Sequence, residues 1–323
     1  MKNYKTFDLT KFVLCFLVIG IHTQIPLLYP MLQPLCKIAV PIFFILSGFL
    51  MHKSFLKGGI DKLNVYLKKT IKLYLLYTAI YMPLTIYGFV KDNLSLVQSI
   101  KLFARNTLLV GENYMSWPLW YLLGLIVASF IILLLLKKST PIKWIAIMGI
   151  ILMMVGHAMD YLHAYGSGPV FITKGLDLYY KMFMYTRNGF FVGFGYVGIG
   201  LAISHYENSI VKYYKWNVLA CIASLGYFMA GFYFGLQLFT TLFACLLVKD
   251  KFYHGENGVW LRNMSTLIYF FHMYFVFLFS FYIPESNIVL NFILVTISTV
   301  CACALILKMK EYIHFHFLNK LLG

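Results

Sequence analysis

The first apolar stretch of the chain contains two charged residues and a histidine, Asp8, Lys11 and His22. On a helix, the side chains of Lys11 and His22 would point in directions that differ by only about 20°, so they share one face. The two residues would lie about 16 Å apart along the helix axis. Asp8 lies one turn before Lys11 and can pair with it. Histidine titrates near neutrality and can act as a general base. The pattern therefore predicts an ion pair of Asp8 and Lys11 at the start of the helix, and a catalytic or proton-handling imidazole, His22, near its end. The alternative is that the two ions lie at the membrane interface and His22 only hydrogen-bonds to a neighbouring helix.

A basic sequence, YLKKTIKLYLLY, opens the third apolar stretch at residues 66–77. Lys69 and Lys72 are three residues apart and share one face of a helix. Two lysines in this position can bind the phosphates of a cytosolic nucleotide-type donor such as coenzyme A. They can equally mark the cytoplasmic side of the membrane and attract anionic headgroups.

Three further residues are candidates for binding a substrate. Arg187 lies at the mouth of a glycine-rich stretch, where a guanidinium can hold an anionic group bidentately or extend to the lipid headgroups. Glu112 precedes the aromatic sequence WPLWYLLGL, which predicts a belt of aromatic side chains at the interface. His272 lies within an apolar stretch, where a hydrogen bond in the core is its default role.

The elements that position these residues must be membrane helices. Of the 323 residues, 61% are hydrophobic and 12% are charged, against about 45–50% and about 25% in soluble domains. This composition excludes a soluble globular fold and a disordered chain, and long unbroken apolar stretches exclude an outer-membrane barrel. The sequence predicts an all-α, polytopic integral membrane protein.

Ten apolar segments are long enough to be considered as transmembrane helices. They are expected near residues 9–29, 35–52, 71–90, 117–136, 142–161, 186–204, 216–232, 233–249, 265–283 and 287–307. The pair within 216–249 is ambiguous, because Gly231 and Gly235 can turn the chain or only kink one helix. In the second segment, Ser47 and Gly48 predict close approach of another helix.

The positive charge indicates the orientation of the segments. With the N-terminus in the cytoplasm, 19 of the 27 Lys and Arg residues fall in the loops on that side, and 7 fall on the other. The positive-inside rule therefore predicts that both termini are cytoplasmic. This distribution explains most of the net charge of +16 without nucleic acid, since no basic stripe with interleaved aromatic residues is present.

The longest loops are expected at 91–116, at 162–185 and at the basic stretch 53–70, and none is long enough for a soluble domain of useful size. Residues 1–323 are therefore expected to form a single transmembrane domain. The histidines lack the spacing of a metal site, and no metal is expected. The six cysteines lie in or beside apolar segments, where a thiol behaves as a small hydrophobic group.

Several short motifs occur in a fixed order along nearly the whole chain. They are D-x-x-K-x(10)-H from Asp8 to His22, FFILSGFLM, the basic entry to the third segment, LWYLL, RNGFF and a late S-x-x-I-Y-x-x-H that ends at His272. This ordered set resembles the acyltransferase-3 family of ten-span membrane proteins, which includes O-acetyltransferases of envelope glycans.

The resemblance implies roles for individual residues. His22 falls on the histidine that is taken as catalytic in the family, and Lys11 falls on the family's arginine ten residues before it. Lys69 and Lys72 fall on an Arg-x-x-Arg motif implicated in handling acyl-CoA. Both motifs here carry lysine in place of arginine, which replaces a bidentate fork by a point charge.

The implied function is transfer of an acyl group, most simply acetyl, from cytosolic acetyl-CoA or another acyl-CoA. The acceptor would be a hydroxyl of an extracytoplasmic glycan or lipid-linked sugar. Asp8 and Lys11 would fix the first helix, Lys69 and Lys72 would hold the donor, and the acceptor side would be formed by Arg187, Glu112 and His272. The implied location is a bacterial plasma membrane, in contact with membrane lipid.

A second class of function stays open. The membrane part of vancomycin-resistance serine racemases resembles the same family and is associated with serine supply, so a small-solute transport module is the alternative. Lysine-bearing variants of the two motifs are compatible with that branch. In a third reading, the chain is a scaffold for envelope synthesis and its titratable residues are dispensable.

Overall fold

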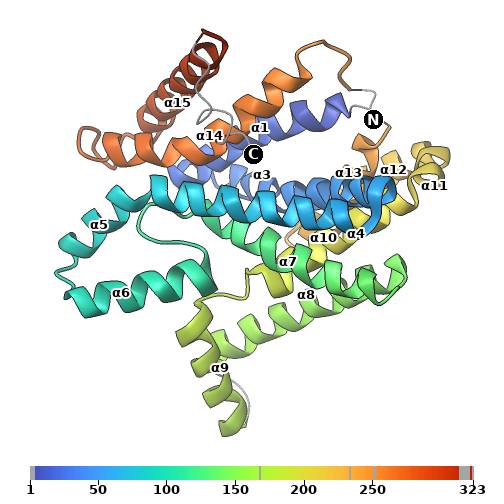
Figure 1. The fold of residues 1–323 in the computed structure, drawn as a ribbon, viewed down its shortest axis with the longest axis horizontal. Helices are drawn as coiled ribbons and strands as arrows, with labels where there is room; N and C mark the ends of the chain where they lie inside the picture. The colour runs from blue at the N-terminus through green and yellow to red at the C-terminus, as the bar shows by residue number, and fades with distance from the viewer. Residues whose placement is uncertain (1–3, 167–168, 233, 250–251, 313–320, 322–323) are drawn as a thin grey trace. The chain divides into compact units, whose positions relative to one another are not determined.

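The computed structural model of the chain describes residues 4–166, 169–232, 234–249, 252–312 and 321. The described residues form helices joined by short connections (Figure 1). In chain order these are α1 (Lys5–His22), α2 (Ile25–Leu28), α3 (Leu32–Lys37), α4 (Ala39–Ile80), α5 (Met82–Lys91), α6 (Leu96–Arg105), η1 (Asn106–Val110), α7 (Leu119–Lys137), α8 (Ile142–Tyr165), α9 (Val170–Phe183), η2 (Gly189–Gly193), α10 (Phe194–His205), α11 (Glu207–Lys212), α12 (Tyr214–Met229), α13 (Gly235–Leu247), α14 (Gly258–Phe279) and α15 (Ile288–Tyr312). The elements η1 and η2 are single π-helical turns.

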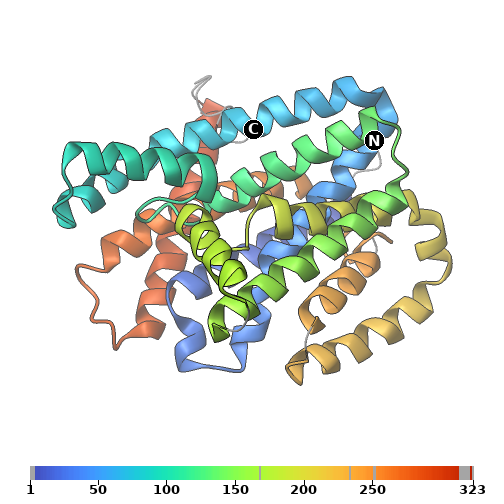
Figure 2. The ribbon, with the colours of Figure 1, turned by 90° about the horizontal axis from the view of Figure 1, so that it is seen from below.

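The helices group into two compact units. The first unit comprises Met1–Leu46 and Tyr206–Gly323, and the second comprises Ser47–His205. Within the first unit, α1 packs along α14, and α14 packs against α15. In Figure 2, α14 and α15 form one helical hairpin of this unit, and α12 and α13 form another.

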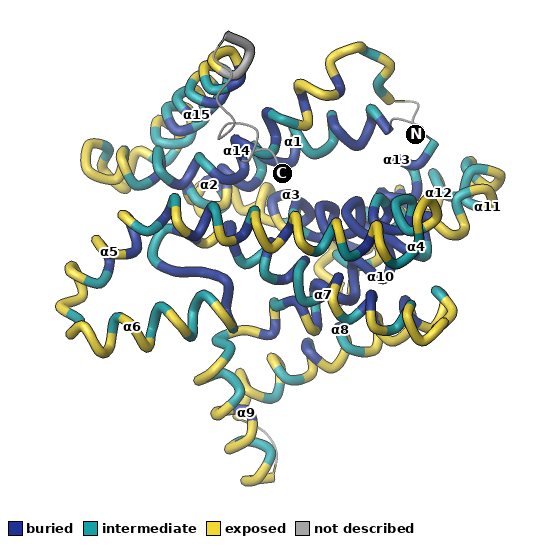
Figure 3. Tube along the Cα trace, in the orientation of Figure 1, coloured by how far each residue is buried: buried dark blue, intermediate teal, exposed yellow. Residues whose placement is uncertain are grey.

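The second unit is organised around α10, which packs against both α7 and α8. Nearly all of α10 is buried, whereas α8 exposes one face (Figure 3). Close packing follows from small residues: Gly195 of α10 approaches the backbone of Gly149, and a Cβ at Gly48 would collide with the carbonyl oxygen of Val197. The prediction of close helix packing at Gly48 is thus confirmed.

The ambiguous stretch 216–249 forms two helices, α12 and α13, that pack against each other. The chain turns between them because Gly231 adopts a positive φ of 77° and Phe234 a positive φ of 63°. A glycine accepts this left-handed conformation without steric cost. The turn therefore agrees with the expectation of two segments in this stretch.

The first helix ends earlier than its apolar pattern predicts. The pattern extended a helix to residue 29, whereas α1 ends at His22 and a separate turn, α2, follows. The break has a local cause, because Gln24 is left-handed at φ 63° and Pro26 in the next turn cannot continue a helical hydrogen-bond ladder. His22 is therefore the last residue of its helix.

The basic stretch 53–70 is helical rather than a loop. Within α4, only Gly58 and Gly59 depart from helical geometry, and Gly59 has φ 57°. Lysine and leucine favour helix, so the helices on both sides extend into this stretch. A cluster of charges indicates a side of the membrane and carries no information about the conformation of the backbone.

Four stretches of the described residues are long and apolar enough to cross a membrane: Leu32–Ile80, Leu119–Lys137, Ile142–Tyr165 and Ile288–Met309. Two shorter apolar helices are Gly189–His205 and Gly235–Leu247. These helices are consistent with a membrane protein. The count of ten spans and the cytoplasmic location of both termini stay predictions, and the terminal residues 1–3 and 322–323 lie outside the described part of the chain.

Candidate functional site

The packing of α1 against α14 brings together two histidines that the sequence placed in separate roles. The imidazole rings of His22 and His272 lie 5.3 Å apart, centroid to centroid. His272 is fully buried, whereas His22 is half-buried at the end of α1. The structure therefore forms a histidine pair at the α1–α14 interface.

The hydrogen bonds of His272 define its proton arrangement. Its Nδ1 lies 3.0 Å from the carbonyl oxygen of Ile268, and because a carbonyl only accepts, Nδ1 carries a proton. Its Nε2 is buried and has no hydrogen-bond partner within the described residues. In the neutral ring this nitrogen is an acceptor, which is suited to receive a proton or a hydrogen bond from a ligand.

Asp8 makes an ion pair that the sequence analysis missed. The guanidinium of Arg262 donates from Nε to Oδ1 and from Nη2 to Oδ2 of Asp8, each at 2.9 Å. The Asp8 side chain is only 6% exposed, whereas that of Arg262 is 50% exposed. Lys11, the partner expected from sequence, lies within electrostatic reach of both residues. Arg262 was counted only as a charge of the cytoplasmic side, and no local pattern links it to Asp8.

Polar contacts recur along the α1–α14 interface. Between the ion pair and the histidine pair, the thiol of Cys15 donates to the carbonyl oxygen of Ser265 at 3.1 Å. Asp8, Cys15 and His22 are seven residues apart in turn, which keeps them near one face of α1. The contacts advance in the same direction on both helices, so α1 and α14 run parallel. The interface thus carries a polar strip through an apolar helix pair.

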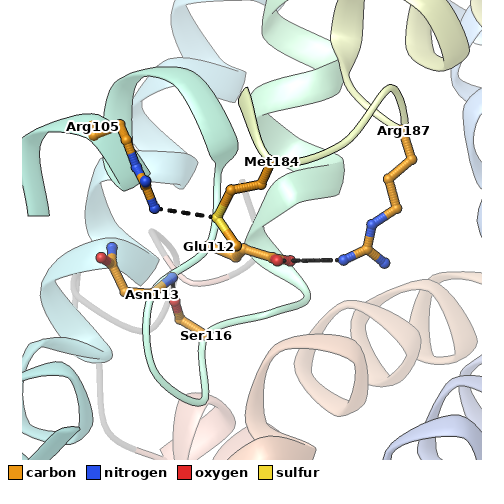
Figure 4. Close-up of polar contacts among 6 residues, drawn as sticks. All are labelled: Arg105, Glu112, Asn113, Ser116, Met184 and Arg187. Carbon is orange, nitrogen blue, oxygen red and sulfur yellow. Dashed lines mark hydrogen bonds and ion pairs between the residues drawn. The ribbon is translucent and has the colours of Figure 1, made fainter. Parts of the chain in front are cut away.

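In the second unit, Glu112 and Arg187 form an ion pair (Figure 4). Nη2 of Arg187 donates to both carboxylate oxygens of Glu112, at 3.1 and 3.3 Å. Glu112 is 8% exposed and Arg187 is 47% exposed. Burial raises the pKa of Glu112 above its ordinary value, and the neighbouring guanidinium offsets only part of this effect. Both residues were predicted for the acceptor side, and the structure brings them together.

Aromatic rings pack against the guanidinium of this ion pair, and a second arginine lies nearby. The Arg187 guanidinium lies 5.2 Å from the ring centroid of Trp120 and 4.6 Å from that of Tyr185, which are cation–π distances. Arg105 donates to the sulfur of Met184 at 3.2 Å, and Figure 4 shows Met184 between Arg105 and Arg187. The region around Glu112 therefore carries excess positive charge.

The lysines predicted to hold a donor are on the surface. Lys69 and Lys72 are both exposed on α4, within the second unit. Exposed lysines are free to reach a phosphate. For metal ions, the described residues contain no cluster of three His, Cys, Asp or Glu side chains that could bind one.

A second polar cluster in the second unit was missed from sequence. His52 Nδ1 lies 2.9 Å from the hydroxyl of Ser204, and the ring of His205 lies 5.8 Å from that of His52. His52 is 2% exposed and its Nε2 has no hydrogen-bond partner among the residues described. The available signal was the position of His52 directly after FFILSGFLM, but its partners lie some 150 residues away in sequence.

Comparison with known proteins identifies the family. The profile of the acyltransferase-3 family, described as an acyltransferase domain, matches residues 4–308. An amino-acid racemase of Enterococcus faecalis is 28% identical over 282 residues, which cover 82% of this chain and 38% of the relative. The chain thus spans less than half of the length of this relative. No solved structure matches the chain. The family match extends over nearly the whole chain and confirms the resemblance seen in the ordered motifs, so the chain belongs to the acyltransferase-3 family of membrane acyltransferases.

Proposed function

We propose that this protein transfers an acyl group, most simply acetyl, from cytosolic acyl-CoA to a hydroxyl of an extracytoplasmic or lipid-linked glycan. His22 is the general base that removes the proton of the acceptor hydroxyl, or a transient carrier of the acyl group. In the first case, the hydroxyl oxygen bonds to the thioester carbonyl carbon and the C–S bond breaks. The CoA thiolate then takes the proton from His22.

The observation that supports this proposal is the pairing of His22 with His272 at 5.3 Å. A histidine that acts on a proton needs a partner that orients it or shares the proton. His272 offers an unprotonated, buried Nε2 on the same polar strip. Two imidazoles at the end of a strip that begins with Asp8 and Arg262 are difficult to explain by packing alone, because buried polar groups are costly in a membrane.

The remaining residues have supporting roles in the proposal. Asp8 and Lys11 fix the first helix, with Arg262 as the additional partner of Asp8. Lys69 and Lys72 neutralise phosphates of the donor from the exposed face of α4. Arg187 and Glu112 belong to the acceptor side, and no metal takes part in the proposed reaction.

A transfer assay tests the proposal. Purified protein or inverted vesicles are incubated with labelled acetyl-CoA and with envelope glycan or lipid-linked sugar as acceptor. We expect acceptor-dependent transfer that falls by about 10²-fold or more in His22→Ala, as for loss of a general base. Transfer that is equally fast in His22→Ala would contradict the role of His22. The absence of transfer to any acceptor would contradict the reaction.

A second candidate function is a transport module for a small polar solute such as serine. The specific observation in its favour is the 28% identity to an amino-acid racemase, of which the matched region covers only 38%. The lysines at positions 11, 69 and 72 are compatible with this function, because no thioester has to be held by a bidentate fork. Uptake of labelled serine into vesicles without consumption of acyl-CoA would favour transport over acyl transfer.

A further inference from the structure

The second unit contains an apolar cavity of about 280 Å³. It is lined by side chains of α7, η1, α9 and η2, chiefly Leu108, Trp120, Leu123, Val127, Phe183 and Phe190. Ligand pockets are usually about 300–1,000 Å³ and mostly apolar, with few polar groups that fix orientation. This cavity is slightly smaller than that range, so it suits one hydrocarbon chain and is narrow for two.

The edge of the cavity carries a guanidinium with unused donors. Trp120 lines the cavity, and Arg187 lies over the ring of Trp120. Only Nη2 of Arg187 is engaged, by Glu112, while Nε and Nη1 make no hydrogen bond within the described residues. Glu112 therefore orients the guanidinium through Nη2 and leaves Nε and Nη1, which face different edges, as two separate donors for an anion such as phosphate.

The order of polar and apolar groups along α7 matches that of an amphiphile. Arg187 lies at Trp120, near the N-terminal end of α7, and the apolar lining continues to Val127. Seven residues of helix correspond to about 10 Å. The predicted orientation places the Trp120 end of α7 at the outer surface and Val127 deeper, so a bound lipid would have its head at the surface and its chain in the membrane.

From this geometry we propose that the second unit binds a single-chain lipid phosphate, with the chain in the apolar cavity and the phosphate on Arg187. The proposal rests on the proposed function, for which it names the lipid-linked class of acceptor. The cations in this part of the unit are Arg105, Arg187 and Lys181, and the carboxylates are those of Glu112, Asp177 and Asp160. Of the latter, Asp160 accepts hydrogen bonds from Tyr180 and Thr186.

Photocrosslinking of the full-length protein in detergent tests the site. The probe is dodecyl phosphate that carries a diazirine in its chain, used below its micellar concentration, and the matched probe is the same chain with a terminal alcohol. We expect the phosphate probe to label peptides of α7 and η2. In Arg187→Gln, labelling by the phosphate probe should fall by about tenfold or more, as expected for loss of a charge-assisted contact, while labelling by the alcohol stays constant.

A second variant tests the cavity itself. Leu123→Trp fills the cavity and should reduce labelling by both probes by about fivefold or more. The matched controls are Ile147→Trp on the exposed face of α8 and Lys143→Gln near the opposite end of the unit. Both controls should label within about twofold of the wild type. If Arg187→Gln is not monodisperse, Leu123→Trp and competition between the two probes decide the outcome.

Three results would overturn the proposal: labelling outside α7 and η2, equal labelling by phosphate and alcohol in the wild type, or competition by phosphatidylglycerol as strong as by dodecyl phosphate. The last result would identify a site for bulk phospholipid. Acyl transfer is measured separately on the same samples. Transfer that persists in Arg187→Gln and Leu123→Trp although labelling is lost would show that the lipid site does not hold the acceptor, whereas labelling of the wild type without any transfer would contradict the reaction alone.

Discussion

The carboxylate of Asp8 accepts two hydrogen bonds of 2.9 Å from the guanidinium of Arg262, a residue 254 positions away in sequence. This bidentate contact joins the starts of α1 and α14, the two helices that carry the histidine pair. Because Asp8 is buried and Arg262 is half-exposed, the arginine provides the main compensation for burying the carboxylate.

Removing this arginine is expected to destabilise the first unit. Arg262→Gln removes the bidentate partner of the buried Asp8 carboxylate, and we expect a loss of roughly 1–3 kcal/mol. Thermal unfolding of the detergent-solubilised protein measures the change. The double variant Asp8→Asn, Arg262→Gln should recover part of the loss, since position 8 no longer carries a buried carboxylate. Additive losses in the two single variants would show that the pair is not coupled.

The proposed role of His272 can be separated from its packing. In His272→Asn, the side-chain amide can still donate to the carbonyl of Ile268, but the position of Nε2 is empty. We expect kcat for acyl transfer to fall by about tenfold or more with a folded protein, and the pH dependence of kcat to change. His272→Gln places a polar atom near Nε2 and should retain more activity. Unchanged kinetics in both variants would reduce His272 to a packing residue.

Gly48 should tolerate no side chain. A Cβ at this position would collide with the backbone of Val197 in α10, so Gly48→Ala should cost about 1–3 kcal/mol. The matched control is Gly226→Ala in α12, where a Cβ would meet no atom within 4 Å. There alanine should be neutral or stabilise the helix by about 0.5–1 kcal/mol. Equal melting temperatures for the two variants would contradict this packing.

The buried carboxylate of Glu112 predicts the direction in which the stability of the folded protein changes with pH. Its pKa is raised in the folded protein, so the neutral form is favoured by folding, and this contribution to stability is lost as the pH rises through the raised value. Glu112→Gln should therefore equal or exceed the wild type in melting temperature at neutral pH. The difference should shrink as the pH falls below the raised pKa. A variant that is less stable at neutral pH and recovers in acid would show that the ion pair with Arg187 outweighs burial.

The two lysines on α4 are expected to affect the binding of the acyl donor. If Lys69 and Lys72 neutralise phosphates of acyl-CoA, the double Gln variant should raise KM for the donor by about tenfold with little change in kcat. The double Arg variant should restore or lower KM, because arginine binds phosphate bidentately. Initial rates at varied acyl-CoA measure both. A KM that is unaffected by the Gln variant would assign the lysines to topology alone.

Local patterns in the sequence were enough to predict an all-α membrane protein, its family and the approximate position of most helices. The helical class and the helix positions depend on composition and periodicity within windows of about 20 residues, which is the length of one membrane helix. The family was indicated by the resemblance of the ordered motifs. The predicted helix boundaries were wrong where individual residues affect the backbone more strongly than the average composition of the window. Pro26 and left-handed Gln24 end the first segment at His22, and only Gly58 and Gly59 interrupt helix within the basic stretch 53–70.

The pairs that give the protein its chemistry required the tertiary structure. His22 meets His272, Asp8 meets Arg262, and Glu112 meets Arg187. The sequence pointed to five of these six residues. Asp8, His22 and His272 were titratable groups within apolar segments, and Glu112 and Arg187 were candidates at the outer ends of segments. It did not give their partners, because contacts between helices far apart in sequence are set by which faces pack together, and hydropathy carries no information about that choice.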